Sequence, residues 1–247
     1  MLFRSGTHGK ALKNVSLSVR SRQILGIAGV AGNGQSELFA AMSGERTVAD
    51  DQSILIDGQA VGKLGIEERR GRGAAFVPEE RLGHAAAPRM KLSENIILTR
   101  QRTASVVKDG LINMNGAIAL AGKISAAFDV RKGHADPVAG SLSGGNLQKF
   151  VVGREILRGP TLLIVNQPTW GVDAGAAATI RQSLIDLALR GAAIVVISQD
   201  LDEIFAISDL ISVIHNGTLS QSIETRATTR DEIGLLMTGG KVVSHAA

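Results

Sequence analysis

The first hydrophobic patterns of the chain predict two strands and a helix around a glycine-rich loop. Apolar residues mostly alternate with polar ones from Leu12 to Val19, which is typical of a half-buried strand. The short apolar run from Ile24 to Val30 ends among glycines and predicts a second strand. Residues 37–43 have a helical composition, and Gly44 supplies a C-terminal stop. The pattern therefore predicts the order strand, glycine loop, helix.

The next patterns predict a small antiparallel piece and a buried strand. Residues 54–56 are apolar, and Asp57-Gly58 after them is a turn signal. Residues 74–77 form an apolar run that Pro78 ends.

From residue 84 to residue 140 the pattern changes to an alanine-rich sequence with helical periodicity. We interpret this segment as a helical insertion. Breaks are expected near Asn95, at Asp109-Gly110 and at residues 132–134.

The last part of the chain alternates helical and strand patterns. They are a helix at 145–158, a strand at 162–165, a helix at 176–189, a strand at 193–198, a helix at 201–207 and a hairpin around 215–217. Alternation of this kind predicts an α/β fold with a mostly parallel sheet and right-handed crossovers.

Composition narrows the class of protein. A chain of 247 residues with 44% hydrophobic content can bury one substantial core. No apolar run approaches the roughly 20 residues that span a bilayer, and the N-terminus lacks a signal-peptide stretch, so we expect a soluble, unexported chain. The net charge of +4 is scattered and only 3% of residues are aromatic, so no nucleic-acid partner is expected.

The glycine loop nearly fits the phosphate-loop pattern G-x-x-x-x-G-K-[ST]. Gly29, Gly34 and Ser36 match, but glutamine stands at position 35 where the pattern has lysine. Backbone amides between the glycines and the N-terminus of the following helix can still bind phosphate. The missing lysine removes a charge-assisted contact of about 1.5 to 3 kcal/mol. Taken alone, such a loop is as often a tight turn as a nucleotide site.

A second motif opens the helix predicted at 145–158. Its sequence is Leu142-Ser-Gly-Gly-Asn146, with Gln148-Lys149 soon after. Ser143 can cap the helix and, with the amides of Gly144 and Gly145, bind an anion that arrives from outside. A plain N-cap before an amphipathic helix is the alternative interpretation.

These motifs, in this order, resemble those of the ATP-binding cassette (ABC) family. The loop 29–37, the segment 142–149 and the segment 162–169 correspond to its Walker A, signature and Walker B motifs. The resemblance implies a P-loop NTPase cassette over residues 1–247, with a mostly parallel core sheet, a small N-terminal antiparallel β subdomain and a helical subdomain at 84–140. The closest likeness is to the second cassette of two-cassette bacterial importers for simple sugars or nucleosides. We expect the chain to be a fragment of such a longer protein.

The chain departs from the family where charge matters. Asn166 and Gln167 stand in place of the aspartate that organises magnesium and the glutamate that polarises water, and Gln199 replaces the switch histidine. The resemblance implies Mg²⁺ near Ser36, Glu79 and Asn166, bound weakly or not at all. Loss of a general base costs ~10² to 10⁴ in rate, so own-site ATP hydrolysis is expected to be weak or absent.

The resemblance also implies further contacts. The implied ATP-binding residues are Gly29, Gly32, Asn33, Gly34, Gln35, Ser36, Glu37, Ser143, Gly144 and Gly145. Asp173 lies in the loop that crosses to a partner cassette, and it can also cap the next helix. Trp170 is expected to be packed or at an interface. Phe3 and His8 are the candidates for stacking on adenine, and the other histidines are expected to be solvated.

The implied partners are a second cassette, placed head to tail, and transmembrane permease subunits at the cytoplasmic side of the inner membrane. Three alternatives stay open. A regulatory or scaffold cassette would use nucleotide only as a conformational switch. A cassette ATPase acting on DNA or ribosomes would bind nucleic acid in a salt-sensitive way. A P-loop kinase would leave the 142–149 motif unexplained.

Overall fold

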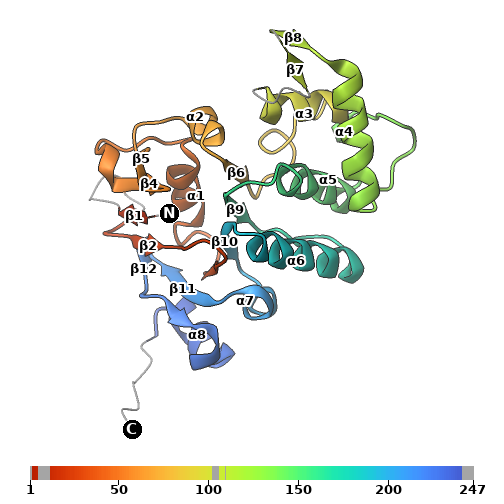
Figure 1. Cartoon of the computed structure of the whole chain (residues 1–247). Coiled ribbons are helices and arrows are strands. Elements are labelled where there is room, and N and C mark those ends of the chain that lie inside the picture. Colours follow the sequence, from red (N-terminus) through yellow and green to blue (C-terminus); the bar gives the residue numbers. More distant parts are fainter. Residues whose placement is uncertain (1, 5–11, 102–105, 109, 241–247) are drawn as a thin grey trace. The chain divides into compact units, whose positions relative to one another are not determined.

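The computed structural model describes residues 2–4, 12–101, 106–108 and 110–240 (Figure 1). The chain forms two compact units. The first comprises Met1–Phe76, Thr161–Gln167 and Leu184–Ala247, and the second comprises Val77–Pro160 and Pro168–Ser183.

The larger sheet of the first unit has the strand order β12-β11-β3-β10-β9-β6, with β13 paired to β11. Its strands are β3 (Ile24–Ala28), β6 (Ala74–Val77), β9 (Leu162–Asn166), β10 (Ala193–Ser198), β11 (Leu210–His215), β12 (Thr218–Leu219) and β13 (Ile223–Glu224). β3 pairs in parallel with β10 and β11, and β10 in parallel with β9. The predicted mostly parallel core sheet is confirmed.

A smaller antiparallel sheet has the order β2-β1-β4-β5. Its strands are β1 (Leu2–Arg4), β2 (Ser16–Ser18), β4 (Ile54–Ile56) and β5 (Gln59–Ala60). This confirms the predicted N-terminal antiparallel piece. The strand predicted from Leu12 to Val19 is regular only in β2, although its apolar residues are buried as the alternation required.

Helices of the first unit lie on both faces of the larger sheet. They are α1 (Gln35–Ser43), α2 (Ile66–Gly71), α7 (Leu201–Ile207) and α8 (Arg230–Met237), with short 3-10 turns at Asp51–Ser53 and Thr225–Ala227. Leu25 and Ile27 of β3 share a buried core with Leu38 of α1. A Cβ on Gly26 would instead lie 2.9 Å from Ile204 of α7. Because side chains alternate along a strand, α1 and α7 cover opposite faces.

The second unit is mainly helical. It contains α3 (Leu92–Arg100), β7 (Val107–Lys108), β8 (Leu111–Ile112), α4 (Met114–Ala127), a 3-10 turn (Ala139–Ser141), α5 (Gly144–Ile156) and the first part of α6 (Ala174–Leu189). The extent of the helical subdomain, 84–140, stays a prediction.

One expected helix break is wrong. Asn95 lies buried inside α3 and does not end it. Its side chain accepts a hydrogen bond from the Ala87 N–H at 2.8 Å and donates to the Ala87 and Met90 carbonyls at 3.1 Å. The amide therefore ties the preceding loop to the helix. The break near Gly110 is confirmed, since the chain turns there between β7 and β8 with a left-handed φ of 79°.

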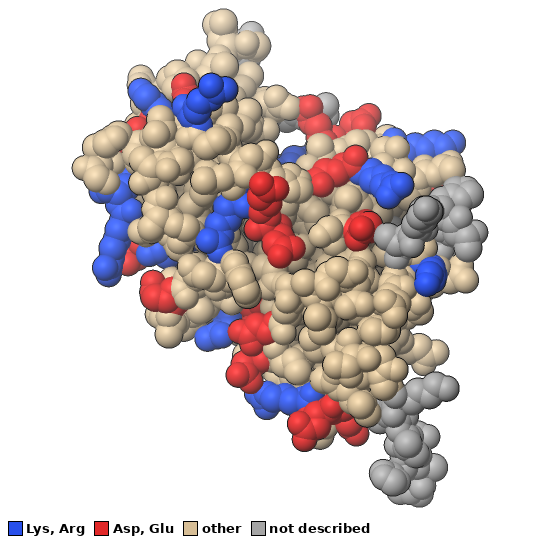
Figure 2. Space-filling model, turned by 180° about the vertical axis from the view of Figure 1, so that it is seen from behind, with Lys and Arg blue, Asp and Glu red and all other residues tan. Residues whose placement is uncertain are grey.

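On the face seen in Figure 2, Lys and Arg side chains are interspersed with Asp and Glu, so this face has no large patch of one charge sign. Among the helices of the described residues, none combines the length and the apolar character needed to cross a membrane.

Candidate functional site

The carboxyl ends of β3, β9 and β10 lie at one edge of the larger sheet. Ala28 pairs with Ser198, and Ile197 pairs with Asn166, so the three neighbouring strands end almost level. In open parallel sheets, ligands bind outside this edge. The structure therefore brings together three of the predicted segments, which are the loop 29–36, the pair 166–167 and Gln199.

The glycine loop has a backbone suited to an anion. Gly34 is the N-cap of α1, with a left-handed φ of 111° and no side-chain cap hydrogen bond. The first-turn N–H groups of a helix have no intrahelical partner, and here no cap side chain takes one of them. The left-handed φ favours glycine at position 34, and a Cβ there would also be in tight contact, at 3.3 Å from Gly217 Cα. The strand, loop and helix order is confirmed, and phosphate binding stays a prediction.

Gln35 folds back into this loop. Its Oε1 accepts a hydrogen bond from the Asn33 N–H at 3.0 Å, and its Nε2 donates to the Val30 carbonyl at 2.7 Å. Its exposed fraction is 7%. The expectation that the backbone amides remain free for phosphate is therefore corrected at Asn33, whose amide is bound by the side chain that replaces the lysine.

Asn33 also fastens the loop to the hairpin between β11 and β12. Its Oδ1 accepts from Asn216 N–H at 2.8 Å, and its carbonyl accepts from Gly217 N–H at 2.9 Å. His215 is half-buried, and its ring is hydrogen-bonded to the Met237 carbonyl and the Asn216 side chain, so it is not simply solvated as expected. The Asn-Gly turn was visible in the sequence, but its contact with the loop was not.

Amide side chains occupy the ends of β9 and β10. Asn166 and Gln167 are 2% and 5% exposed, and Gln199 is half-buried. Gln167 has a left-handed φ of 53°, donates its N–H to the Ile197 carbonyl at 2.8 Å and accepts from the Ser198 hydroxyl at 3.5 Å. Since an amide carries no negative charge and accepts no proton, none of these side chains can act as a general base.

The residues at this edge do not fit a magnesium ion. Mg²⁺ prefers carboxylate oxygens and ordered water. The first unit offers the exposed Ser36 hydroxyl and the buried Asn166 amide, while Glu79 belongs to the second unit. No group of three or more His, Cys, Asp or Glu suited to a metal occurs among the described residues.

In the second unit, the start of α5 is confirmed at the predicted motif. Ser143 is the N-cap, and its Oγ accepts from Asn146 N–H at 3.4 Å and from Asn146 Nδ2 at 2.9 Å. Asn146 Oδ1 in turn accepts from the Arg131 N–H at 2.8 Å. Asn146 therefore holds the capping serine in place. Anion binding by Gly144 and Gly145 stays a prediction.

Arg81 is a residue of this unit that the sequence reasoning missed. Its Nε donates to Gln148 Oε1 at 3.0 Å, and its Nη2 donates to the Trp170 carbonyl. Gln148 Nε2 donates to the Pro168 carbonyl at 2.9 Å, and a Cβ on Gly144 would lie 2.8 Å from Arg81 Nη1. Burial lowers the pKa of Arg81. The guanidinium thus joins α5 to the loop after β9, and nothing in the local sequence indicated it.

The structure also places three other residues of this unit that the sequence analysis named. Asp173 Oδ1 accepts from Ala176 N–H at 2.9 Å, which confirms the cap of α6 and is the main cause of a lowered Asp173 pKa. Trp170 is 64% exposed, so packing in a core is excluded for it. Glu79 is exposed.

The two candidates for adenine stacking cannot be placed. His8 lies outside the described residues, and Phe3 is described only through its backbone in β1.

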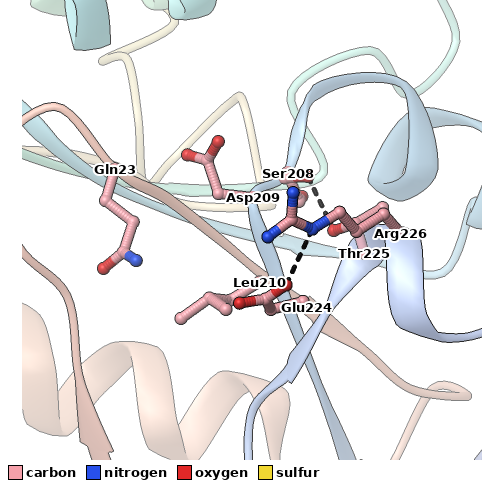
Figure 3. A pocket seen from close by; sticks show the side chains of 7 residues that line it. All are labelled: Gln23, Ser208, Asp209, Leu210, Glu224, Thr225 and Arg226. Atoms are coloured by element: carbon pink, nitrogen blue, oxygen red, sulfur yellow. Dashed lines mark hydrogen bonds and ion pairs between the residues drawn. The ribbon is translucent and has the colours of Figure 1, made fainter.

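A separate pocket lies at the opposite edge of the sheet, at the amino ends of β3 and β11 (Figure 3). Asp209 accepts from Ile24 N–H at 2.8 Å, and Glu224 accepts from Arg226 Nε at 2.8 Å. Its charged side chains therefore stabilise the local fold, and the pocket is not part of the candidate site.

A parallel sheet with a glycine loop and an uncapped helix N-terminus at its carboxyl edge is the arrangement typical of α/β proteins of the phosphate-loop class. Residues 12–170 match the profile of the family described as "ABC transporter". The chain belongs to the ABC transporter family.

Solved structures support the same fold. The chain is similar to one described as "Dimeric Structure of MJ0796, a Bacterial ABC Transporter Cassette", with a TM-score of 0.74, 20% identity and coverage of 92% of this chain and 96% of that one. At this identity the likeness shows the cassette fold alone.

Curated relatives are similar over most of the chain. The glucose import ATP-binding protein TsgD13 of Haloferax volcanii is 40% identical, covering 94% of this chain and 42% of the relative. The nucleoside import ATP-binding protein NupA of Lactococcus lactis subsp. cremoris is 39% identical, covering 94% and 46%. The chain thus spans less than half the length of these relatives.

Proposed function

We propose that this chain is a nucleotide-binding cassette of an importer for simple sugars or nucleosides, and that its own site holds ATP weakly without turning it over. Relatives named for glucose and nucleoside import support the first part. The second part rests on one observation, which is that Asn166, Gln167 and Gln199 place only amides at the strand ends beside the glycine loop.

The chemistry of the site follows from these side chains. The first-turn amides of α1 bind a phosphate group through main-chain dipoles. Asp200, the carboxylate next to Gln199, is engaged as the cap of α7, where it accepts hydrogen bonds from the Asp202 and Glu203 N–H groups. The amides at the strand ends cannot prime water, and loss of a general base costs ~10² to 10⁴ in rate. The side chains present therefore support binding without hydrolysis.

The second unit has the other role. Ser143 caps α5 and leaves the amides of Gly144 and Gly145 at the helix N-terminus, where they complete the ATP site of a partner cassette. The partners are a second cassette, in the same polypeptide or on another chain, and permease subunits. The chain is peripheral, at the cytoplasmic side of the inner membrane.

Calorimetric titration with ATP and a steady-state phosphate-release assay on the purified chain test this function. We expect a dissociation constant no tighter than about micromolar, which is about 8 kcal/mol of binding free energy, and turnover near zero. Brisk hydrolysis by the chain alone would overturn the proposal. Co-purification with permease subunits separates an importer cassette from a regulatory one.

A further inference from the structure

We propose that the side-chain amide of Gln35 is an internal occupant of the phosphate loop, which ATP has to displace, and that this competition sets the affinity of the site. The inference rests on the proposed nucleotide role of the loop. It goes beyond the loss of the lysine, because it assigns the glutamine an opposing contribution of its own.

The contacts of Gln35 are those of a bound ligand. Its Oε1 lies 3.0 Å from Asn33 N, where it accepts the hydrogen bond that a phosphate oxygen would accept. Its Nε2 lies 2.7 Å from the Val30 carbonyl. At 7% exposure the amide is removed from water, so both hydrogen bonds are made within the protein. Phosphate can reach the Asn33 N–H only after Oε1 has left it.

Glutamine is suited to this role and lysine is not. A lysine ammonium has three donors and no acceptor, so it can satisfy the Val30 carbonyl but never the Asn33 N–H. A glutamine amide has both a donor and an acceptor, so it can satisfy the two groups together. Glutamine at position 35 thus removes a cation from the loop and also fills one of its donor positions.

The loop does not depend on Gln35 for its shape. Asn33 Oδ1 and the Asn33 carbonyl accept from Asn216 and Gly217 N–H at 2.8 and 2.9 Å. Asn33 Nδ2 donates to the Val30 carbonyl at 2.8 Å, which leaves that carbonyl a partner when Gln35 moves away. Removal of the amide should therefore free the Asn33 N–H without unfolding the loop.

Gly29 makes room for the folded-back side chain. A Cβ at Gly29 would lie 2.8 Å from Gln35 Nε2 and 2.6 Å from Ile214 Cγ2. The absence of a side chain at Gly29 is thus a condition for the observed position of the amide.

Titration of wild type, Gln35→Ala and Gln35→Lys with Mg-ATP tests the inference, with Gln221→Ala as the control. Gln221 is an exposed glutamine of the same unit. We expect Gln35→Ala to bind ATP about five-fold more tightly than wild type, equivalent to about 1 kcal/mol, because one intramolecular hydrogen bond no longer competes. Gln35→Lys should bind about ten-fold more tightly again, because it adds a charge-assisted contact. Gln221→Ala should match wild type.

A second measurement is independent of affinity. Amide hydrogen exchange at Asn33, without nucleotide, should be faster in Gln35→Ala than in wild type and should slow again when ATP is added. Thermal unfolding of each variant checks that it is folded.

The outcomes separate the two claims. If wild type binds ATP and Gln35→Ala binds it equally or more weakly, the glutamine is a donor to phosphate or a bystander, and the internal occupant is excluded. If no variant binds ATP, Gln35→Lys included, the nucleotide role of the loop fails as well.

Discussion

At the scale of single residues, Arg69 stabilises the carboxyl end of α1. It is fully buried, and its guanidinium donates to the carbonyls of Ala41 and Met42 at 2.7 and 2.8 Å and of Leu64 at 2.9 Å. Burial lowers its pKa to about 10, so it stays charged at neutral pH. Arg69→Met should lower the free energy of unfolding by about 3 kcal/mol, because buried carbonyls lose their donor. Urea unfolding at pH 7 measures the change.

Arg72→Met is the matched control for that prediction. Arg72 is exposed, and its Nη1 donates to the Gln59 side chain at 2.8 Å. A surface contact of this kind contributes within about 0.5 kcal/mol. If Arg69→Met changed the free energy of unfolding by no more than about 0.5 kcal/mol, like Arg72→Met, the bonds of Arg69 to α1 would add nothing to stability.

Asp173 gives a pH-dependent prediction. Its pKa is lowered, chiefly by the hydrogen bond from Ala176 N–H. A carboxyl whose folded pKa is depressed contributes stability above its unfolded pKa of about 3.9, and that stability is lost as the pH falls through the folded value. The difference in unfolding temperature between wild type and Asp173→Ala should therefore be largest near neutral pH and should shrink as the pH falls below about 3.9.

A second variant isolates the charge of Asp173. Asp173→Asn keeps a capping oxygen but does not titrate, so its difference from Asp173→Ala should not change with pH. A constant difference between wild type and Asp173→Ala over the same range would contradict the assigned cause.

At the scale of elements, the strands and helices predicted from the sequence are those with a long or strongly apolar pattern. β3, β9 and β10 are buried along their whole length and were recognised as apolar runs, and Ser143 marked the start of α5. α2 was missed because six residues are too few to show a helical period. α8 is short too, but its capping box, from Thr229 to Glu232, was a usable signal.

Two helical glycines should respond in opposite ways to alanine. A Cβ on Gly153 of α5 would lie 2.5 Å from the Phe128 ring, while one on Gly122 of α4 would meet nothing within 4 Å. Gly122→Ala should stabilise the protein by about 0.4 to 1 kcal/mol through helix propensity and unfolded-state entropy. Gly153→Ala should destabilise it by about 1 to 3 kcal/mol through overpacking.

Chemical unfolding measures the change in the free energy of unfolding for both glycine variants. Each variant serves as the control for the other because the substitution is the same. Stabilisation by both would mean that the Phe128 ring moves aside easily, and that α5 does not need a glycine at this contact.

At the scale of the whole molecule, the order of the motifs predicted where the candidate site lies. It did not predict which contacts the side chains of the site make. Loops that follow neighbouring parallel strands must meet at one edge, so the grouping of the loop 29–36 with 166–167 and Gln199 followed from topology. The position of the Gln35 side chain and the bonds of Arg81 depend on rotamers and on contacts between distant segments. No periodicity or motif in one sequence encodes these.

The chain spans less than half the length of the curated relatives TsgD13 and NupA. The proposed function gives the units unequal roles, because the signature of one serves the ATP site of a partner cassette. A change at the signature should then affect hydrolysis by the assembly, while a change at the strand ends of the first unit should not.

Gly144→Asp and Gln199→Ala test this asymmetry in an importer reconstituted in lipid vesicles with its partner cassette and permease. Aspartate is favoured in the first turn of a helix. A Cβ at position 144 would lie 2.8 Å from Arg81 Nη1, so the end of the Arg81 side chain has to shift, and thermal unfolding checks that Gly144→Asp is folded. Its charge repels phosphate, and we expect ATP turnover to fall about 100-fold, by analogy with the loss of a positioned donor. Gln199→Ala should leave turnover within about two-fold, because that site performs no chemistry. The reverse pattern would show that hydrolysis takes place in this chain's own site, and equal losses would show that the two sites act symmetrically.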